Sequence, residues 1–331
     1  MRGSQFWPEG AGSSRDEPSI GLTQQRIEWP GGRQFAFTVF DDPDGQTLPT
    51  SQLVYSFLAD LGFRTTIAVW PLDVRRERNS GGETCANGAY RDFLRSLQSK
   101  GFEIAFHHAA PHSSSRAETI EALDRFAQHF GGPPAAMANH YNQEALYWGT
   151  ARLSGLRRAV YNLVTLGRNE GKFFGDVNGH PAFWGDVCYE RIRYCRNFVY
   201  RDINTLRSCP WMPYADPKRP YVRAWFAASE GAAGGSFMQA LSERNQDRLE
   251  EQGGLSIMYT HFGHGFVEGG QLHPRFRQLM ERLARKRGWL VPTTTILDFL
   301  SRERGTKVLD ENERRRLEGR WLREKFLHGT S

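Results

Sequence analysis

Three short clusters of acidic and histidine side chains could carry chemistry in this sequence. They are the pair Asp41-Asp42, the run 107–112 with three histidines, and the run 260–264 with two. His108 and His112 are four residues apart, a spacing that lets both imidazoles face one metal ion on a turn or a first helical turn. His261 leads into a glycine-containing loop, a setting that suits a proton-transfer group. Each cluster also has a structural interpretation: a solvated Asp-Pro-Asp-Gly turn, packed or surface histidines, and a hydrogen-bonded histidine.

The elements around these clusters alternate between short strands and helices. Strands are predicted at 35–40, 65–70, 102–106, 135–138, 255–259 and 289–291. Helices are predicted at 51–61, 88–100, 116–129, 236–250, 274–287 and 293–302. This alternation predicts parallel strands joined by helical crossovers. All three clusters directly follow predicted strands. Because functional groups of parallel α/β barrels gather where the strands end, we expect the clusters to meet.

Together the clusters contain the parts of a hydrolytic metal site. Two histidines and one carboxylate form a three-ligand zinc site with an open position for water. The remaining aspartate can act as general base on that water, and the distant histidine can protonate a leaving amine. The combination predicts metal-assisted hydrolysis of an amide or an ester.

The order of these motifs resembles the polysaccharide deacetylase (NodB-homology) family, carbohydrate esterase family 4. The likeness is carried by Thr-Val-Phe-Asp-Asp at 38–42, Gly-Phe-Glu-Ile-Ala-Phe-His-His at 101–108 with a further histidine at 112, and Tyr-Thr-His at 259–261. Residues about 33–149 and 254–300 carry it, roughly half of the chain. The resemblance implies a distorted (β/α) barrel of about seven parallel strands. It also implies Asp41 as catalytic base, His261 as catalytic acid, and one divalent metal ion, expected to be Zn²⁺, held by Asp42, His108 and His112.

Several departures mark the sequence as divergent from that family. Pro43 stands where the family usually has glycine, and Val39 interrupts the usual Thr-Phe step. His107 competes with His108 as the first ligand, and we choose His108 because it keeps the four-residue spacing to His112. The family's third motif offers an arginine that orients the base. No arginine stands after the fourth predicted strand, where 138–142 reads Ala-Asn-His-Tyr-Asn.

The expected substrate is an N-acetylated or O-acetylated carbohydrate, and a nucleotide-linked or lipid-linked sugar suits an intracellular enzyme. Candidate residues around the substrate are His140, His180, Asp186 and Tyr214. The resemblance further suggests Asp186 as the aspartate that orients the acid. Two alternatives stay open. One is hydrolysis of a non-sugar amide on the same fold, and the other is an inactive homologue that binds glycans by aromatic stacking.

Composition and charge limit the partners and the cellular location that we expect for this protein. The 331 residues carry 43 Lys and Arg against 37 Asp and Glu, and a net charge of +6 demands neither nucleic acid nor a membrane as partner. No apolar run approaches the ~20 residues of a membrane span, and the start lacks the apolar core of a signal peptide. We therefore expect a cytoplasmic protein without stable membrane insertion. The four scattered cysteines predict no disulfide scaffold.

The expected organisation has three parts. They are an N-terminal arm at 1–30, a deacetylase-like domain at 31–303 with an aromatic and proline-rich insertion at about 150–250, and an amphipathic helix and tail at 304–331.

Overall fold

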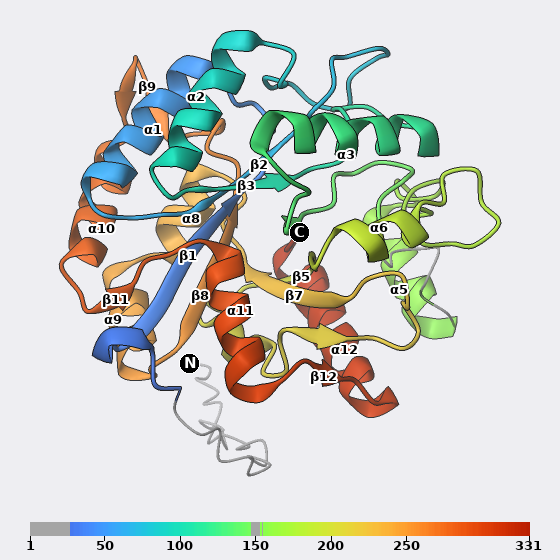
Figure 1. Cartoon of the computed structure of the whole chain (residues 1–331). Coiled ribbons are helices and arrows are strands. Elements are labelled where there is room, and N and C mark those ends of the chain that lie inside the picture. The colour runs from blue at the N-terminus through green and yellow to red at the C-terminus, as the bar shows by residue number, and fades with distance from the viewer. Residues whose placement is uncertain (1–26, 147–152, 154) are drawn as a thin grey trace, which may run out of the picture.

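The computed structural model describes residues 27–146, 153 and 155–331, and it confirms the predicted α/β barrel. Seven parallel strands close in the order β1-β2-β3-β4-β5-β7-β8 and back to β1 (Figure 1). Their bounds are β1 Phe35–Asp41, β2 Thr66–Val69, β3 Glu103–Phe106, β4 Ala136–Met137, β5 Tyr194–Tyr200, β7 Ala224–Ser229 and β8 Leu255–Thr260. The closing pair is β1 with β8, in register from Ala36 with Leu255 to Asp41 with Thr260.

Short strands extend the edges of the barrel. β11 (Gly288–Trp289) runs parallel to the start of β1. β6 (Tyr214–Ala215) pairs antiparallel with β7, and β12 (Lys307–Val308) pairs with β6. A separate hairpin of β9 (Val267–Glu268) and β10 (Gln271–Leu272) follows the loop after β8. This hairpin lies against α1.

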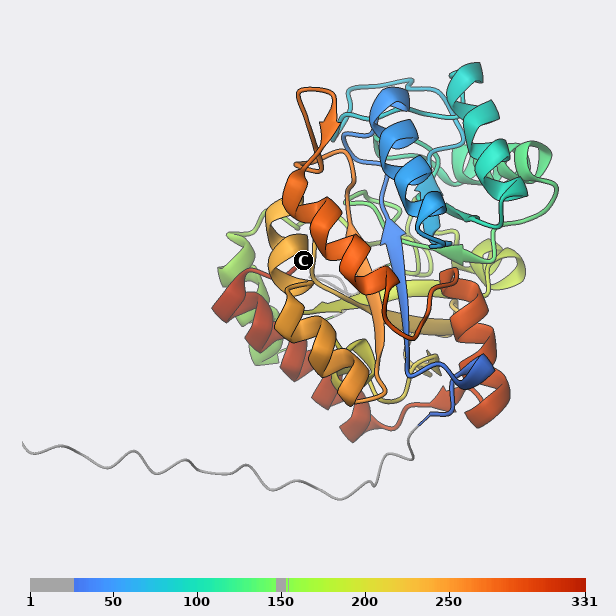
Figure 2. The ribbon, with the colours of Figure 1, turned by 90° about the vertical axis from the view of Figure 1, so that its left-hand side faces the viewer.

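Helices surround the barrel (Figure 2). They are η1 Pro30–Gly32, α1 Leu48–Asp60, α2 Gly88–Ser99, α3 Arg116–Phe130, α5 Gly155–Thr165, α6 Gly185–Arg191, α7 Thr205–Ser208, α8 Gly234–Ala240, α9 Glu243–Glu251, α10 Pro274–Ala284, α11 Thr293–Arg304 and α12 Glu311–His328. Capping boxes start α3, through Ser115 and Glu118, and α12, through Asp310 and Glu313. None of the described helices is long and apolar enough to cross a membrane.

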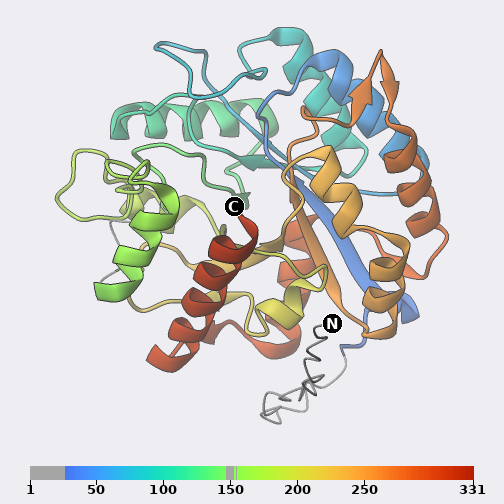
Figure 3. The ribbon, with the colours of Figure 1, turned by 180° about the vertical axis from the view of Figure 1, so that it is seen from behind.

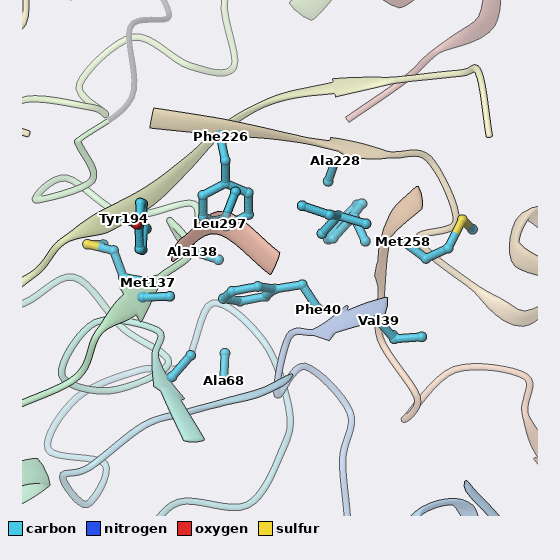
Figure 4. Packing of buried hydrophobic residues seen from close by; sticks show 14 of the residues in the cluster. Val39, Phe40, Ala68, Met137, Ala138, Tyr194, Phe226, Ala228, Met258 and Leu297 are labelled. Atoms are coloured by element: carbon cyan, nitrogen blue, oxygen red, sulfur yellow. The ribbon is translucent and has the colours of Figure 1, made fainter. Parts of the chain in front are cut away.

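Apolar side chains fill the interior of the barrel. Every residue of β1 and of β8 is buried. Phe40 on β1 and Phe226 on β7 meet across the interior, with ring centroids 5.7 Å apart (Figure 4). Because the interior is packed with rings and aliphatic groups, polar chemistry belongs at the ends of the strands.

The stretch 150–250, predicted as an insertion, contains β5 and β7, and so provides two strands of the closed barrel. In the tail, α12 packs against α5 and β5, and Figure 3 shows it lying across that side of the barrel. Residues 1–26 of the predicted N-terminal arm lie outside the described part of the chain. The contact of α12 with β5 thus joins the tail to a barrel strand from the middle of the chain.

Candidate active site

A cavity of about 310 Å³ lies at the carboxyl ends of the barrel strands. Its lining includes Asp42 and Asp44 after β1, His107 after β3, His140 after β4 and His261 after β8. These loops meet because the parallel strands that precede them end at the same face of the barrel. The cavity therefore gathers residues from all three sequence clusters.

Asp44, His107 and His140 form a group with the geometry of metal ligands. Their donor atoms all lie within 4.8 Å of one another. Nε2 of His140 is 3.2 Å from Oδ1 of Asp44, and Nε2 of His107 is 3.6 Å from Oδ2 of the same carboxylate. One carboxylate and two imidazoles are a donor set that zinc and similar divalent ions bind. These three residues would hold such an ion.

Two further features of this group fit a bound cation. Oδ2 of Asp44 and Nδ1 of His107 are buried without a hydrogen-bond partner among the described residues, although buried polar atoms are normally paired. Nδ1 of His140 lies 2.9 Å from Oδ1 of Asn142, whose oxygen also accepts a hydrogen bond from Asn79. An Nδ1–H donor on His140 leaves Nε2 free to bind a metal, as supporting hydrogen bonds in metal sites commonly do.

The charges of the group follow from burial and mutual contact. Burial alone raises the pKa of Asp44, but contacts with His107 and His140 lower that pKa overall. Burial lowers the pKa of His107, against the opposing charges of Asp42 and Asp44. For His140, burial acts to lower the pKa, but contact with Asp44 raises it overall. An ionised Asp44 and a neutral His107 are the protonation states in which these groups bind metals.

Asp42, predicted as a metal ligand, instead forms a buried ion pair with Arg196 of β5. The guanidinium donates from Nη1 to Oδ1 at 2.9 Å and from Nη2 to Oδ2 at 2.5 Å. The same guanidinium lies 4.3 Å from the centre of the Tyr259 ring. Arg196 lies on β5, the barrel strand that follows β4. This bidentate pairing fixes the Asp42 carboxylate beside His107, whose Nδ1 is 3.8 Å away.

His261 lines the cavity as the sequence analysis expected. Its Nδ1 is 2.7 Å from the carbonyl oxygen of Ala232, so an Nδ1–H donor fixes the ring. Its Nε2 then lies 3.3 Å from the hydroxyl of Tyr259 and 3.7 Å from Oδ2 of Asp44. A backbone carbonyl thus orients this imidazole, the task that the resemblance suggested for Asp186.

Asp41, predicted as the base, points away from the cavity into the core. Its Oδ1 accepts a hydrogen bond from the backbone N–H of Phe262 at 2.8 Å. Its Oδ2 accepts hydrogen bonds from the hydroxyl of Tyr55 and the amide of Gln46. Burial raises the pKa of Asp41, while these donors act to lower it. Asp41 therefore ties the end of β1 to the loop after β8, and it is not among the residues that line the cavity.

The predicted ligands His108 and His112 also lie outside the cavity lining. His108 has a φ of 65°, in the left-handed region that few non-glycine residues adopt. Its fully buried ring lies 5.9 Å from that of Trp184, and burial lowers its pKa. Nε2 of His112 accepts a hydrogen bond from the backbone N–H of Arg75 at 3.1 Å. The predicted ligand set is therefore not brought together, whereas the group of Asp44 and two other histidines is.

Of the residues predicted around the substrate, His140 joins the candidate metal ligands and the other three lie outside the cavity lining. Nδ1 of His180 accepts a hydrogen bond from the backbone two residues further on. Asp186 is exposed and forms an ion pair with Arg116 at 2.6 Å. Tyr214 is buried behind the cavity wall, where its hydroxyl accepts a hydrogen bond from Asn197 at 3.2 Å.

Aromatic rings from distant parts of the chain complete the wall of the cavity. They are Tyr141, Tyr161, Phe173, Tyr259 and Trp321. Tyr161 of α5 stacks on Trp321 of α12, with centroids 5.7 Å apart and an interplanar angle of 24°. Tyr161 and Phe173 belong to the predicted aromatic stretch 150–250, and Trp321 belongs to the predicted amphipathic tail helix. Neither prediction showed that both regions would share one cavity.

No protein-family model and no curated protein matches the sequence. Among solved structures, the chain is similar to Puue allantoinase, with a TM-score of 0.52 and 13% identity, over 90% of this chain and 100% of that one. The fold is that of a divergent NodB-like barrel. A probable polysaccharide deacetylase from Pseudomonas aeruginosa PAO1 has a TM-score of 0.48 and 13% identity, over 85% of this chain and 95% of that one. A family 4 carbohydrate esterase from Streptomyces lividans, in complex with acetate, has a TM-score of 0.35 and 13% identity, over 76% and 88% of the two chains.

Proposed function

We propose that this protein is a metal-dependent hydrolase that removes an acetyl group from an N-acetylated or O-acetylated carbohydrate. One observation carries the proposal. Asp44, His107 and His140 converge within 4.8 Å in a cavity that Asp42 and His261 also line. This cavity therefore combines a metal-ligand set with separate candidates for base and acid. The proposal assigns these roles to residues that differ in part from those expected from the motifs.

Asp44, His107 and His140 would hold one divalent ion, for which Zn²⁺ is our choice. When bound, the ion would supply Lewis-acid polarisation of the acyl carbonyl and of water. Because two of the three ligands are almost fully buried and the third is largely so, they are positioned before substrate arrives.

Asp42 is our candidate for the general base. Its bidentate contact with Arg196 fixes the plane of the carboxylate. A carboxylate held in this way can take a proton from water that attacks the acyl carbon. The tetrahedral carbon then collapses with cleavage of the bond to the sugar nitrogen or oxygen.

His261 is our candidate for the general acid. The carbonyl of Ala232 holds Nδ1–H and turns Nε2 toward the cavity. A proton on Nε2 can then pass to the leaving amine or alcohol as the acyl bond breaks. The acid and the base therefore come from the loops after β8 and β1, on strands that are direct neighbours.

The aromatic wall supports a carbohydrate as substrate. Tyr161, Trp321, Tyr141 and Phe173 line the cavity, and flat aromatic faces suit sugar rings. A cavity of about 310 Å³ lies at the lower end of the range for ligand pockets. It favours a single sugar unit, such as one linked to a nucleotide or a lipid, over a long stretch of polymer.

The test is acetate release by metal-loaded protein from a panel of acetylated sugars. N-Acetylglucosamine, its short oligomers and O-acetylated sugars would be offered to apo, zinc-loaded and Asp42→Asn protein. We expect acetate and the free amine or alcohol in equal amounts, dependence on added metal, and little turnover by the variant. If fully metal-loaded protein released acetate from none of the acetylated sugars, the proposal would be contradicted.

Hydrolysis of a small non-sugar amide at the same site is the second candidate. The modest cavity volume favours it as well, since a small amide needs no extended groove. Its signature would be ammonia or a ring-opened product from cyclic and linear amides, without acetate.

A further inference from the structure

Lys325, in the last turn of α12, lines the same cavity as the candidate metal ligands. Its Nζ donates a hydrogen bond to the carbonyl oxygen of Thr330 at 2.9 Å. The same Nζ lies 5.3 Å from the centre of the Trp321 ring, which belongs to the cavity wall. The ammonium is therefore held at the cavity by a neutral acceptor and an aromatic face.

Within the described residues, Lys325 forms no ion pair with a carboxylate. The other cationic side chain of the cavity lining, Arg196, is already paired with Asp42. Glu230 contributes opposing charge to Lys325. However, the two oxygens of Glu230 accept hydrogen bonds from the backbone N–H groups of Ala232 and Ser331. A partly buried ammonium without a paired anion is costly unless a ligand supplies the anion.

We infer that Lys325 recognises an anionic group, a carboxylate or a phosphate, on the substrate of this cavity. The inference rests on the proposed function for the identity of that substrate as an acetylated sugar. Burial lowers the pKa of Lys325, and a bound anion would oppose that shift. The sugar would occupy the cavity while its anionic substituent reaches Nζ of Lys325. An uncharged sugar would lack this charged contact.

A purely structural role predicts a different behaviour for Lys325. A lysine near the end of a helix can stabilise that end by donating to carbonyl oxygens, and the bond to Thr330 has this form. In that case the substitution Lys325→Met would lower the melting temperature but would leave the choice between neutral and anionic sugars unchanged.

The experiment compares kcat/KM for N-acetylglucosamine, N-acetylmuramic acid and N-acetylglucosamine 6-phosphate on zinc-loaded protein. The two anionic sugars separate the carboxylate from the phosphate. Because a hydrogen bond to a charged group contributes more than a neutral one, we expect one anionic sugar to be preferred roughly tenfold to hundredfold. We expect Lys325→Met to abolish this preference through KM, and Lys325→Arg to keep most of it. Lys307→Met, which removes an exposed lysine of β12, should leave the preference unchanged.

A parallel calorimetric titration with glucosamine and glucosamine 6-phosphate, on the same variants, needs no turnover. Turnover of acetylated sugars without an anionic preference, or with a preference that survives Lys325→Met, would overturn the inference and leave the proposed function standing. Lys325-dependent binding of glucosamine 6-phosphate without release of acetate from any sugar would support anion recognition and overturn the proposed function. Thermal unfolding of each variant would separate loss of recognition from loss of the fold.

Discussion

His107 and His108 are adjacent residues after β3, but they have different surroundings. His107 lines the cavity, whereas the ring of His108 packs against Trp184. The loop after β1 divides in the same way. Asp41 is bonded into the core through Tyr55 and Phe262, while Asp44, three residues later, faces the histidines of the cavity. On one side are groups that line the cavity and whose donor atoms converge within 4.8 Å. On the other are Asp41, which is held by hydrogen bonds, and His108, whose ring packs against Trp184 and whose two ring nitrogens are buried without a hydrogen-bond partner among the described residues.

From this contrast we conclude that a cluster of acidic and histidine residues predicts a site but does not indicate which of those residues faces the cavity. Successive side chains of a strand point to opposite faces, and the left-handed φ of His108 rotates the chain again just beyond β3. Four-residue spacing in a loop therefore carries less geometric meaning than the same spacing on a regular helix.

Asp44→Asn should have the largest effect on turnover. The substitution keeps the shape of the side chain but removes the negative charge of the candidate ligand, and metal polarisation contributes several kcal/mol to catalysis. We expect turnover to fall by about 10³-fold or more with metal in excess, measured as acetate release. Asp60→Asn, at the exposed end of α1, is the matched control. Turnover close to that of the control would remove Asp44 from the site.

His261→Ala should have the second-largest effect on turnover. The variant should keep its metal, since His261 is outside the candidate ligand group, but it should lose the proton donor. A positioned acid or base contributes about 10²–10⁴-fold. Steady-state turnover beside metal analysis checks both halves of this expectation. An unchanged rate would show that another group protonates the leaving atom.

Asp41→Asn should lower the stability of the fold. The amide offers one acceptor where the carboxylate has two, and its N–H₂ would face the donors that Asp41 now satisfies. We expect the free energy of unfolding to fall by about 1–3 kcal/mol, measured by urea denaturation, with metal content unchanged. Tyr55→Phe removes one of the same hydrogen bonds and should cost less. A variant as stable as wild type but without turnover would return Asp41 to the role of base.

His112→Ala should have the smallest effect. It removes one acceptor for the backbone N–H of Arg75, which should cost about 0.5–1.5 kcal/mol of stability. Differential scanning calorimetry would measure the loss. Metal content should match that of wild type, and a metal-free variant would restore His112 as a ligand.

The sequence predicted the fold better than the site. The predicted strands at 35–40, 65–70, 102–106 and 255–259 correspond to β1, β2, β3 and β8, because buried parallel strands are compact apolar runs. β5 was not recognised, since it carries Arg196 and Asn197 in the middle of the strand. Those two side chains line the cavity. A strand that supplies polar groups to a site loses the apolar signature by which strands are found.

Within the site, the roles of Asp44 and His140 could not be assigned from spacing. Asp44 belongs to the sequence Asp-Pro-Asp-Gly at 42–45, which is typical of a turn and so gives no sign of a further role. The metal-binding role that we propose for Asp44 depends on His140, 96 residues away, which contacts the same carboxylate. His140 was predicted as a residue near the substrate. It follows β4, which is connected to β1 through the pairings β1–β2, β2–β3 and β3–β4. Such long-range contacts are set by the barrel and not by any local motif.

The most direct test of this account is the metal content per chain of two double variants, each loaded with zinc and then dialysed. One is His107→Ala/His140→Ala, which removes the histidines of the cavity group. The other is His108→Ala/His112→Ala, which removes the histidines outside the cavity lining. Elemental analysis should find about one zinc per chain in wild type. We expect the same zinc content in the second variant and almost none in the first. Retention of zinc by the first variant together with its loss from the second would contradict the account.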